Sequence, residues 1–253
     1  MNIITANITC NWSNFITVNN VMIHAGMLYE KIKQEKPDII AFQEMVPESL
    51  EFLKIACPDY DFFGLFRTET FDGEGLYTAI RKDTYEVTAF EGFWISPTPY
   101  VPDSRYPEQS ECPRVCIVTD VRNKKSGERM RLFNVHLDHI SDNARKLGME
   151  CVLSFMEEYH KKNPMPVVLL GDFNANPDTI VIDTCKAFQP IKLVDLTADL
   201  AFTFHGFGRC KTKIDYIFVS EDLAKRFRKA YVWDDEKCGI YLSDHYPVCV
   251  EIE

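Results

Sequence analysis

Residues 166–177 read PVVLLGDFNANP, and this stretch combines a buried strand with a polar turn. The apolar run PVVLL is typical of a strand that is covered on both faces. A glycine and then Asp172 follow directly, so we expect this carboxylate at the mouth of the strand. Loops at strand ends carry functional groups on a rigid scaffold, which makes Asp172 a candidate site residue.

Similar segments recur along the chain in both directions. Apolar, β-branched and aromatic runs predict strands at 2–8, 38–43, 75–80, 85–95, 115–122, 131–137, 213–219 and 247–252. Apolar residues at helical spacing predict helices at 21–36, 48–56 and 143–160. The polar tip at 123–128 predicts a hairpin between the two strands that flank it.

The order of these segments decides between fold classes. Several strands follow one another without a helix between them, which argues against a parallel, doubly wound sheet. Strands of alternating polarity instead need two sheets packed face to face, with the long helices on the outer faces. We therefore predict an α/β fold, a four-layer sandwich in the order helix–sheet–sheet–helix. No linker or repeat interrupts the pattern, so we expect residues 1–253 to form a single domain.

Composition restricts the environment and the partners. The 253 residues carry a formal net charge of -10, which argues against general binding to nucleic acid. We find no apolar run long enough for a transmembrane helix and no secretory signal pattern. The nine cysteines are scattered without CxxC pairs, which is typical of reduced thiols and not of disulfides or zinc. We expect a cytoplasmic protein, and a monomer.

Polar clusters follow several of the predicted strands, and any one of them alone is compatible with a solvated surface. Carboxylates that converge without matching cations repel one another, and a divalent cation resolves the repulsion. Oxygen ligands suit Mg²⁺ or Mn²⁺ better than Zn²⁺. Asp244 and His245 are neighbours in an extended segment and point in opposite directions, so a carboxylate from another strand must orient His245.

Taken together, the clusters resemble the endonuclease/exonuclease/phosphatase family, which includes DNase I and exonuclease III. The resemblance is greatest to bacterial members of unassigned substrate, and it implies the DNase I-like form of the same sandwich. It rests on seven motifs that occur in the order of the family: ANI at 6–8, FQE at 42–44, NVHLDH at 134–139, LLGDFNANP at 169–177, TFHGF at 203–207, KIDYIFVS at 213–220 and SDHYPV at 243–248.

The resemblance implies a metal site and an activated water. Glu44 matches the principal ligand of a Mg²⁺ (or Mn²⁺) ion, with Asn7 and Asp244 beside it. Asp172 matches the residue that holds the attacking water or the metal. Asn174 matches a residue that contacts the phosphate.

The resemblance also implies the groups that handle protons and charge. His245 matches the catalytic histidine, and Asp215 matches the carboxylate that orients it through a hydrogen bond. His136 matches a second acid or phosphate contact, and Glu74 falls where such enzymes place its acidic partner. A carboxylate partner would favour the charged imidazolium of His136. Arg114 resembles a phosphate-contacting residue.

These residues predict a Mg²⁺-dependent phosphoesterase that hydrolyses a phosphate monoester or diester by in-line attack of an activated water. The alternatives are a DNA or RNA nuclease and, more remotely, a binding protein that kept the fold without activity. Duplex DNA is not the expected partner, because a protein that contacts many phosphates needs clustered lysines and arginines. In and directly after the loop at 203–212 only three basic residues cluster, namely Arg209, Lys211 and Lys213. We expect specificity to lie in the loops at 10–20, 67–75, 97–113 and 203–212.

Overall fold

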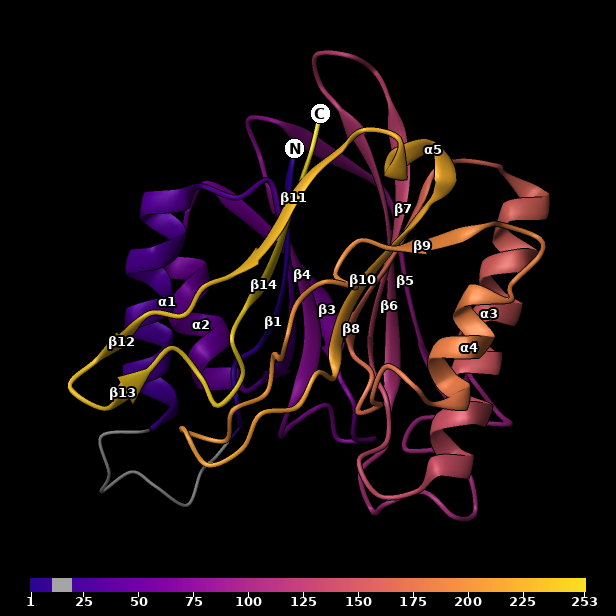
Figure 1. Cartoon of the computed structure of the whole chain (residues 1–253), viewed down its shortest axis with the longest axis horizontal. Coiled ribbons are helices and arrows are strands. Elements are labelled where there is room, and N and C mark those ends of the chain that lie inside the picture. Colours follow the sequence, from indigo (N-terminus) through magenta and orange to yellow (C-terminus); the bar gives the residue numbers. More distant parts are fainter. Residues whose placement is uncertain (11–19) are drawn as a thin grey trace.

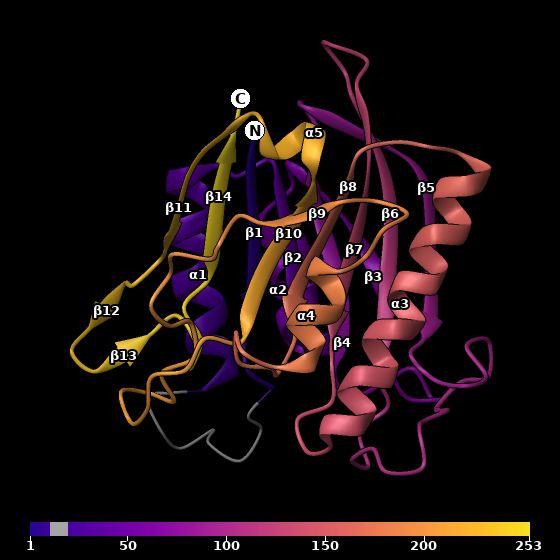
Figure 2. The same cartoon turned by 45° about the vertical axis from the view of Figure 1, so that its right-hand side comes forward.

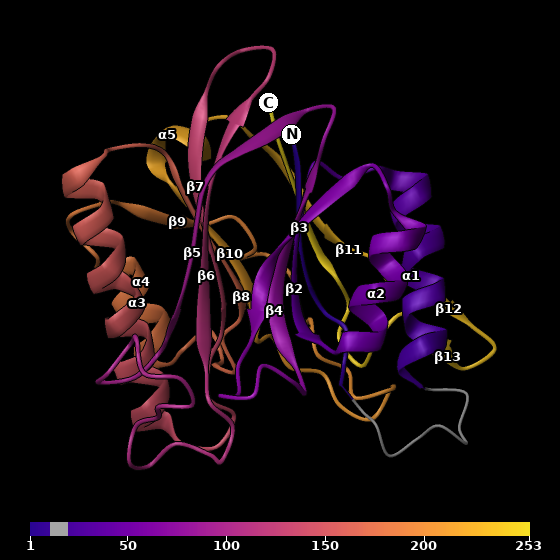
Figure 3. The same cartoon turned by 180° about the vertical axis from the view of Figure 1, so that it is seen from behind.

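The computed structural model consists of two six-stranded mixed sheets packed face to face, with helices on both outer faces (Figure 1). It describes residues 1–10 and 20–253. The predicted four-layer α/β sandwich is confirmed, and the view from behind shows the same order of layers (Figure 3). The predicted loop at 10–20 lies outside the described residues except at its two ends.

The first sheet has the strand order β11-β14-β1-β2-β4-β3 and the second has the order β5-β6-β7-β8-β10-β9. The strands of the first sheet are β1 (Asn2–Asn7), β2 (Ile39–Met45), β3 (Tyr60–Phe66), β4 (Gly75–Arg81), β11 (Phe227–Val232) and β14 (Val248–Ile252). Those of the second are β5 (Tyr85–Trp94), β6 (Val115–Asn123), β7 (Arg129–His136), β8 (Val167–Asp172), β9 (Leu193–Asp195) and β10 (Asp215–Ser220). The short strands β12 (Glu236–Lys237) and β13 (Ile240–Tyr241) form a separate hairpin.

Helices cover the sheets on opposite sides of the molecule (Figures 1 and 2). The helices α1 (Val21–Glu35) and α2 (Pro47–Ala56) pack on the first sheet, and α3 (Asp142–Lys162) and α4 (Ile180–Lys186) pack on the second. A single turn, α5 (Glu221–Ala224), follows β10. None of the helices in the described part of the chain is long and apolar enough to cross a membrane.

Apolar clusters between the layers hold the sandwich together. The central core joins side chains of both sheets, such as Ile3 and Val250 with Leu170 and Ile217. The outer cores bury one face of each helix pair against its own sheet. Strands such as β8 are therefore covered on both faces, as their continuous apolar sequences predict.

The predicted hairpin is confirmed: β6 and β7 pair antiparallel, and the Asn123 side chain accepts hydrogen bonds from two backbone N–H groups of the turn. The sequence patterns did not predict β3, β9, β11 or α4. The strands β3 and β11 lie at the edges of the first sheet and are only partly buried, so they lack the strong apolar signal of central strands. The helix α4 has 7 residues, too few for a clear period.

The topology brings the ends of many strands to one end of the sandwich. Strands β1 and β2 run parallel, as do β7 and β8, so their carboxyl ends lie at the same level in each sheet. Strands β4, β6, β10 and β14 run antiparallel to these and begin where the others end. Every predicted site residue lies at or next to one of these strand ends, at the end of the molecule away from the two termini (Figure 1).

A buried polar contact fixes the two sheets against each other just beneath this end. The Gln43 side chain donates a hydrogen bond to the Asn134 side-chain oxygen at 2.8 Å, and neither residue is exposed. The Asn134 amide in turn donates to the backbone carbonyls of Phe42 and Tyr77. Since buried polar groups demand specific partners, this network sets the register of one sheet against the other.

Candidate active site

A buried histidine and two aspartates form the centre of the site. His245 Nδ1 lies 2.9 Å from Asp215 Oδ2, so the predicted hydrogen bond between them is confirmed. On the other side of the ring, Nε2 lies 3.8 Å from Asp172 Oδ2. Because the carboxylate of Asp215 accepts the Nδ1 proton, it fixes the orientation of the ring and leaves Nε2 facing Asp172.

The strands place these three side chains as the sequence predicts. Asp172 ends β8 and Asp215 begins β10, and the two residues are direct partners across this antiparallel pair. His245 lies in the segment that leads into β14. Gly171 precedes Asp172 at a φ of +141°, and a Cβ atom there would lie 1.9 Å from the Val135 carbonyl oxygen. Only glycine therefore allows β8 to lie this close to β7 at the mouth of the site.

Burial and neighbouring charges shift the pKa values of this group in opposite directions. Burial raises the pKa of Asp172 to about 7, and the negative charge of Asp215 adds to the effect. Burial lowers the pKa of His245, but the charge and hydrogen bond of Asp215 outweigh it and raise the value to about 10. At neutral pH the histidine is a cation, and Asp172 is close to its titration midpoint.

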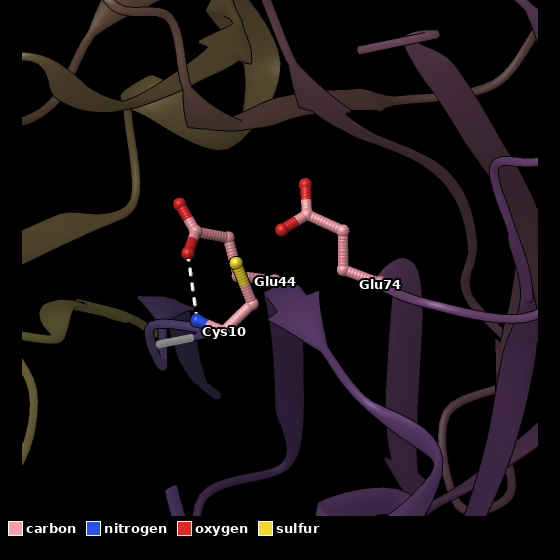
Figure 4. A group of neighbouring side chains, drawn as sticks. All are labelled: Cys10, Glu44 and Glu74. Carbon is pink, nitrogen blue, oxygen red and sulfur yellow. Dashed lines mark hydrogen bonds between the residues drawn. The ribbon is translucent and has the colours of Figure 1, made fainter. Parts of the chain in front are cut away.

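Glu44 lies beside this centre, at the end of β2, where two hydrogen bonds hold its carboxylate. Asn7 Nδ2 donates to Oε1 at 3.0 Å, and the Cys10 backbone N–H donates to Oε2 at 2.8 Å (Figure 4). Burial raises the pKa of Glu44, but these hydrogen bonds outweigh it, so the net shift is downward. The carboxylate is therefore ionised at neutral pH.

The backbone at Glu44 departs from regular strand geometry. Its φ is +57°, and the pairing of β2 with β4 shifts register between Phe42 and Met45. Such irregularities cost conformational free energy and re-aim a side chain at the end of a strand. Here the bulge turns the Glu44 carboxylate toward the second sheet, where Asn7 joins it to Asp172 through a second hydrogen bond of 3.0 Å.

Asn7, Asp244 and Asn174 complete the predicted set. The Asn7 side-chain oxygen accepts from the Thr9 N–H, so its amide nitrogen, not its oxygen, faces the carboxylates. Asp244 is half-buried, burial raises its pKa, and the charge of Glu44 contributes to the shift. Asn174 has a φ of +49°, and its side chain donates to the Leu137 carbonyl. Asn7 and Asp244 therefore lie near Glu44, while the backbone N–H of Asn174 donates to Asp172 Oδ1 at 2.9 Å.

His136 and Glu74 do not form the predicted pair. Glu74 instead forms an ion pair with Arg67, while His136 Nε2 lies 3.5 Å from Asp172 Oδ2. Burial lowers the pKa of His136 well below its usual value, and the charges of Arg114 and Arg67 lower it further. The expectation of an imidazolium held by Glu74 is therefore wrong: His136 is neutral, because burial disfavours its charged form and the two guanidinium cations add to this effect.

Glu74 lies close to Cys10, which follows β1, and to Glu44 in β2 (Figure 4). One ligand atom each of Cys10, Glu44 and Glu74 lies within 4.8 Å of the others. Burial raises the pKa of Glu74, and the negative charge of Glu44 raises it further. Burial also raises the pKa of the Cys10 thiol, which therefore remains protonated beside the two carboxylates.

Three functional candidates in this region were not singled out from the sequence: Arg67, His139 and Cys10. Arg67 follows β3, an edge strand that sequence patterns did not predict, although the loop at 67–75 was expected to contribute to specificity. His139 was seen in the NVHLDH motif but without a role; its Nδ1 lies 2.9 Å from Arg114 Nη2. Cys10 carries no pattern beyond its closeness to Asn7 in the sequence.

One basic residue near the site is already paired. Lys213 forms an ion pair of 3.2 Å with Asp195, and both side chains are buried. It is therefore not available to contact a substrate, which leaves Arg209 and Lys211 from the predicted basic cluster.

Comparison with known proteins agrees with this geometry. Residues 23–245 match the Endonuclease/Exonuclease/phosphatase family. The chain belongs to this family. Members of the endonuclease/exonuclease/phosphatase family are phosphoesterases and nucleases, so the predicted class of enzyme is supported. A search of proteins with curated descriptions found no significant match.

Solved structures of the family are similar over the whole chain. A mannosyl-6-phosphatase from Bacteroides thetaiotaomicron VPI-5482 is 26% identical, with a TM-score of 0.88 over 100% of this chain and 99% of that one. A family member from Bacteroides vulgatus is 25% identical, with a TM-score of 0.88 over 100% and 98% of the two chains. TDP2 from D. rerio, solved with a single-stranded DNA product, shares the fold at 18% identity, with a TM-score of 0.78 over 99% and 97%.

Proposed function

We propose that this protein is a Mg²⁺-dependent phosphoesterase that hydrolyses a phosphate ester by in-line attack of an activated water. The observation that carries the proposal is the buried His245–Asp215 pair, which faces Asp172 and lies next to the ionised Glu44. The arrangement combines a proton acceptor, a cation and a metal-binding carboxylate at one end of the two sheets. Hydrolysis of an anionic ester requires these three functions.

The donor chemistry of the site supports a hard divalent cation. Glu44 and Glu74 repel each other, as the raised pKa of Glu74 indicates, and a cation between carboxylates relieves such repulsion. Since the Cys10 thiol stays protonated, the available ligands are oxygens, which suit Mg²⁺ or Mn²⁺. Glu44 would hold the ion, with Asp244 and Asn7 close by. When bound, such an ion neutralises charge on a phosphoryl oxygen.

The protein's own side chains divide the remaining chemistry between them. Asp172, with a pKa raised to about 7, accepts a proton from the attacking water. The His245 imidazolium, fixed by Asp215, stabilises the negative charge that develops on the phosphoryl oxygens. As the new P–O bond forms, the ester P–O bond breaks; the leaving oxygen takes a proton from solvent water, and Asp172 returns the proton that it accepted to solvent. Asn174 and Arg114 would contact the phosphate.

The substrate that we propose is a phosphate ester of small or medium size, and not duplex DNA. The net charge of -10 repels a polyanion, and few basic side chains remain free at this end of the described chain. The similar mannosyl-6-phosphatase supports a sugar phosphate as one candidate within this class. We further propose that residues 1–253 act as one domain and as a monomer.

A panel assay tests the proposal. Purified protein with Mg²⁺ is incubated with sugar phosphates, inositol phosphates, a generic phosphodiester and single- and double-stranded nucleic acids. We expect hydrolysis of a phosphate ester that EDTA abolishes and that Glu44→Ala greatly reduces. Activity that survives both treatments would overturn the metal site.

The same panel separates the alternatives. Cleavage of nucleic acid with higher efficiency than any small ester, together with steeply salt-dependent binding, would establish the nuclease instead. Binding of a phosphate ester without turnover at any metal concentration would establish a non-catalytic binding protein.

A further inference from the structure

Arg114 is a buried cation without a counterion. It precedes β6 at the site end of the second sheet and is 4% exposed. Its Nη2 donates to His139 Nδ1, but Nε and Nη1 have no hydrogen-bond partner among the described residues. The two carboxylates near it are engaged elsewhere, because Glu74 pairs with Arg67 and Asp138 accepts from Ser110 and two backbone N–H groups.

Burying a guanidinium group whose N–H donors are unpaired is energetically unfavourable unless an anion accepts hydrogen bonds from them. A charged donor that is buried and unpaired destabilises the fold, and a bound anion can supply the missing partner. Burial lowers the pKa of Arg114, and the positive charge of Arg67 lowers it further. Of these two cations only Arg67 forms an ion pair with Glu74.

Arg67 is held rigidly on the same side of the site. Its backbone carbonyl accepts a hydrogen bond of 2.6 Å from the indole of Trp94, and its side chain is 12% exposed. Its partner Glu74 has a ligand atom within 4.8 Å of one on Glu44. Asn7 in turn donates hydrogen bonds to both Glu44 and Asp172. This chain of contacts connects Arg67 to the carboxylate that we propose activates water.

We propose that Arg67 and Arg114 form the recognition site for the terminal phosphate of a monoester, and that this pair makes the enzyme a phosphomonoesterase and not a phosphodiesterase. The inference rests on the proposed function. A monoester carries close to two negative charges and three non-bridging oxygens, whereas a diester carries one charge and two such oxygens. Two guanidinium groups match the first charge distribution, since each binds phosphate through a planar fork of donors.

This assignment gives His139 a positioning role. His139 is exposed, and its Nδ1 accepts a hydrogen bond from Arg114 Nη2. The Nε and Nη1 groups of Arg114 then remain free to donate to a bound anion. The pKa of His139 itself is lowered, first by burial and then by Arg114, so the ring remains a neutral acceptor.

The test compares two substrates in matched variants. The values of kcat/KM are measured for p-nitrophenyl phosphate and bis(p-nitrophenyl) phosphate with the wild type, Arg114→Lys, Arg67→Gln and the control Arg129→Gln. Arg129 is an exposed arginine at the start of β7, at the opposite end of the sheets from the site. We expect each site variant to lose about 30-fold or more for the monoester and less than about threefold for the diester, as for loss of charge-assisted hydrogen bonds. The control should change neither.

Titration of inorganic phosphate by calorimetry gives a readout that does not depend on turnover. The wild type should bind phosphate, Arg114→Lys and Arg67→Gln should weaken this binding by about tenfold or more, and Arg129→Gln should not. Circular dichroism and thermal unfolding monitor the fold of each variant. Lysine is chosen at position 114 because it keeps the positive charge and removes the planar set of donors.

The outcomes distinguish the inference from the proposed function. Equal losses for both substrates, or unchanged affinity for phosphate, would overturn the role of the arginine pair and leave the phosphoesterase intact. A wild type that hydrolyses no ester would refute the phosphoesterase, while the phosphate titration would still decide whether the two arginines bind the anion.

Discussion

Asp215→Asn tests the chemistry of the site at its best-defined contact. The carboxylate lies 2.9 Å from His245 Nδ1, and both residues are buried. The substitution keeps the size of the side chain but removes the charge that raises the pKa of His245 from 6.5 to about 10. Since burial alone lowers that pKa, we expect it to fall by several units, toward 6.5, and the ring to lose its cationic form above neutral pH.

The geometry gives the size of the effect on turnover. A charge-assisted hydrogen bond contributes about 1.5–3 kcal/mol, which corresponds to a loss of about 10- to 150-fold in kcat. The loss should be larger at pH 8 than at pH 6, because the remaining histidine is protonated only at the lower pH. KM should change less, since Asp215 does not itself face the substrate.

The same shift predicts a change in stability with a defined sign. Because the folded-state pKa of His245 is raised, its contribution is complete below about pH 6.5 and is lost as the pH rises through about 10. The wild type in EDTA should lose up to about 5 kcal/mol of unfolding free energy across this window, and Asp215→Asn should lose much less.

The assays are steady-state kinetics at several pH values, urea unfolding in EDTA and NMR titration of the His245 ring. Asp38→Asn is the matched control: this carboxylate also pairs with a cation, Arg81, but at the opposite end of β2. It should lower stability modestly and leave kcat unchanged. An unaltered kcat in Asp215→Asn, or an unaltered titration midpoint of His245, would refute the reasoning.

Three further predictions concern other parts of the molecule. Glu44→Ala should abolish binding of Mn²⁺ in a calorimetric titration and lower kcat at least about 100-fold, without loss of stability in EDTA, because it removes the repulsion on Glu74. His136→Asn should lower kcat about tenfold without moving the midpoints of the pH–rate profile, since His136 stays neutral; a moved midpoint would mean that it titrates. Asp120→Asn breaks the buried ion pair with Arg131 outside the site and should cost about 3–5 kcal/mol in urea unfolding, with kcat unchanged for the folded fraction.

Much of the site could be predicted because its residues belong to contiguous motifs at the ends of strong strands. The apolar runs before Glu44 and Asp172 are long enough to identify central strands, so the position of each carboxylate at a strand mouth follows from local sequence. The hydrogen bond between Asp215 and His245 followed from the family resemblance together with the argument that Asp244 cannot orient its own neighbour.

Other parts of the site could not be predicted, because they depend on contacts between distant segments. Arg67 follows an edge strand with a weak apolar pattern, and its pairing with Glu74 depends on how β3 lies against β4. The protonation state of His136 likewise required the positions of two guanidinium groups from separate loops.

The sequence by itself determined the layers, the central strands and the types of side chain at the site, because periodicity and burial are local properties of each segment. Only the tertiary structure decided which charges meet. Electrostatic interactions depend on distance and burial, and these arise when the two sheets pack and bring Asn7, Glu44 and Asp172 together from separate strands. For the same reason only the packing of the sheets showed that Arg67 lies on the same side of the site as Arg114, which the family resemblance had already indicated.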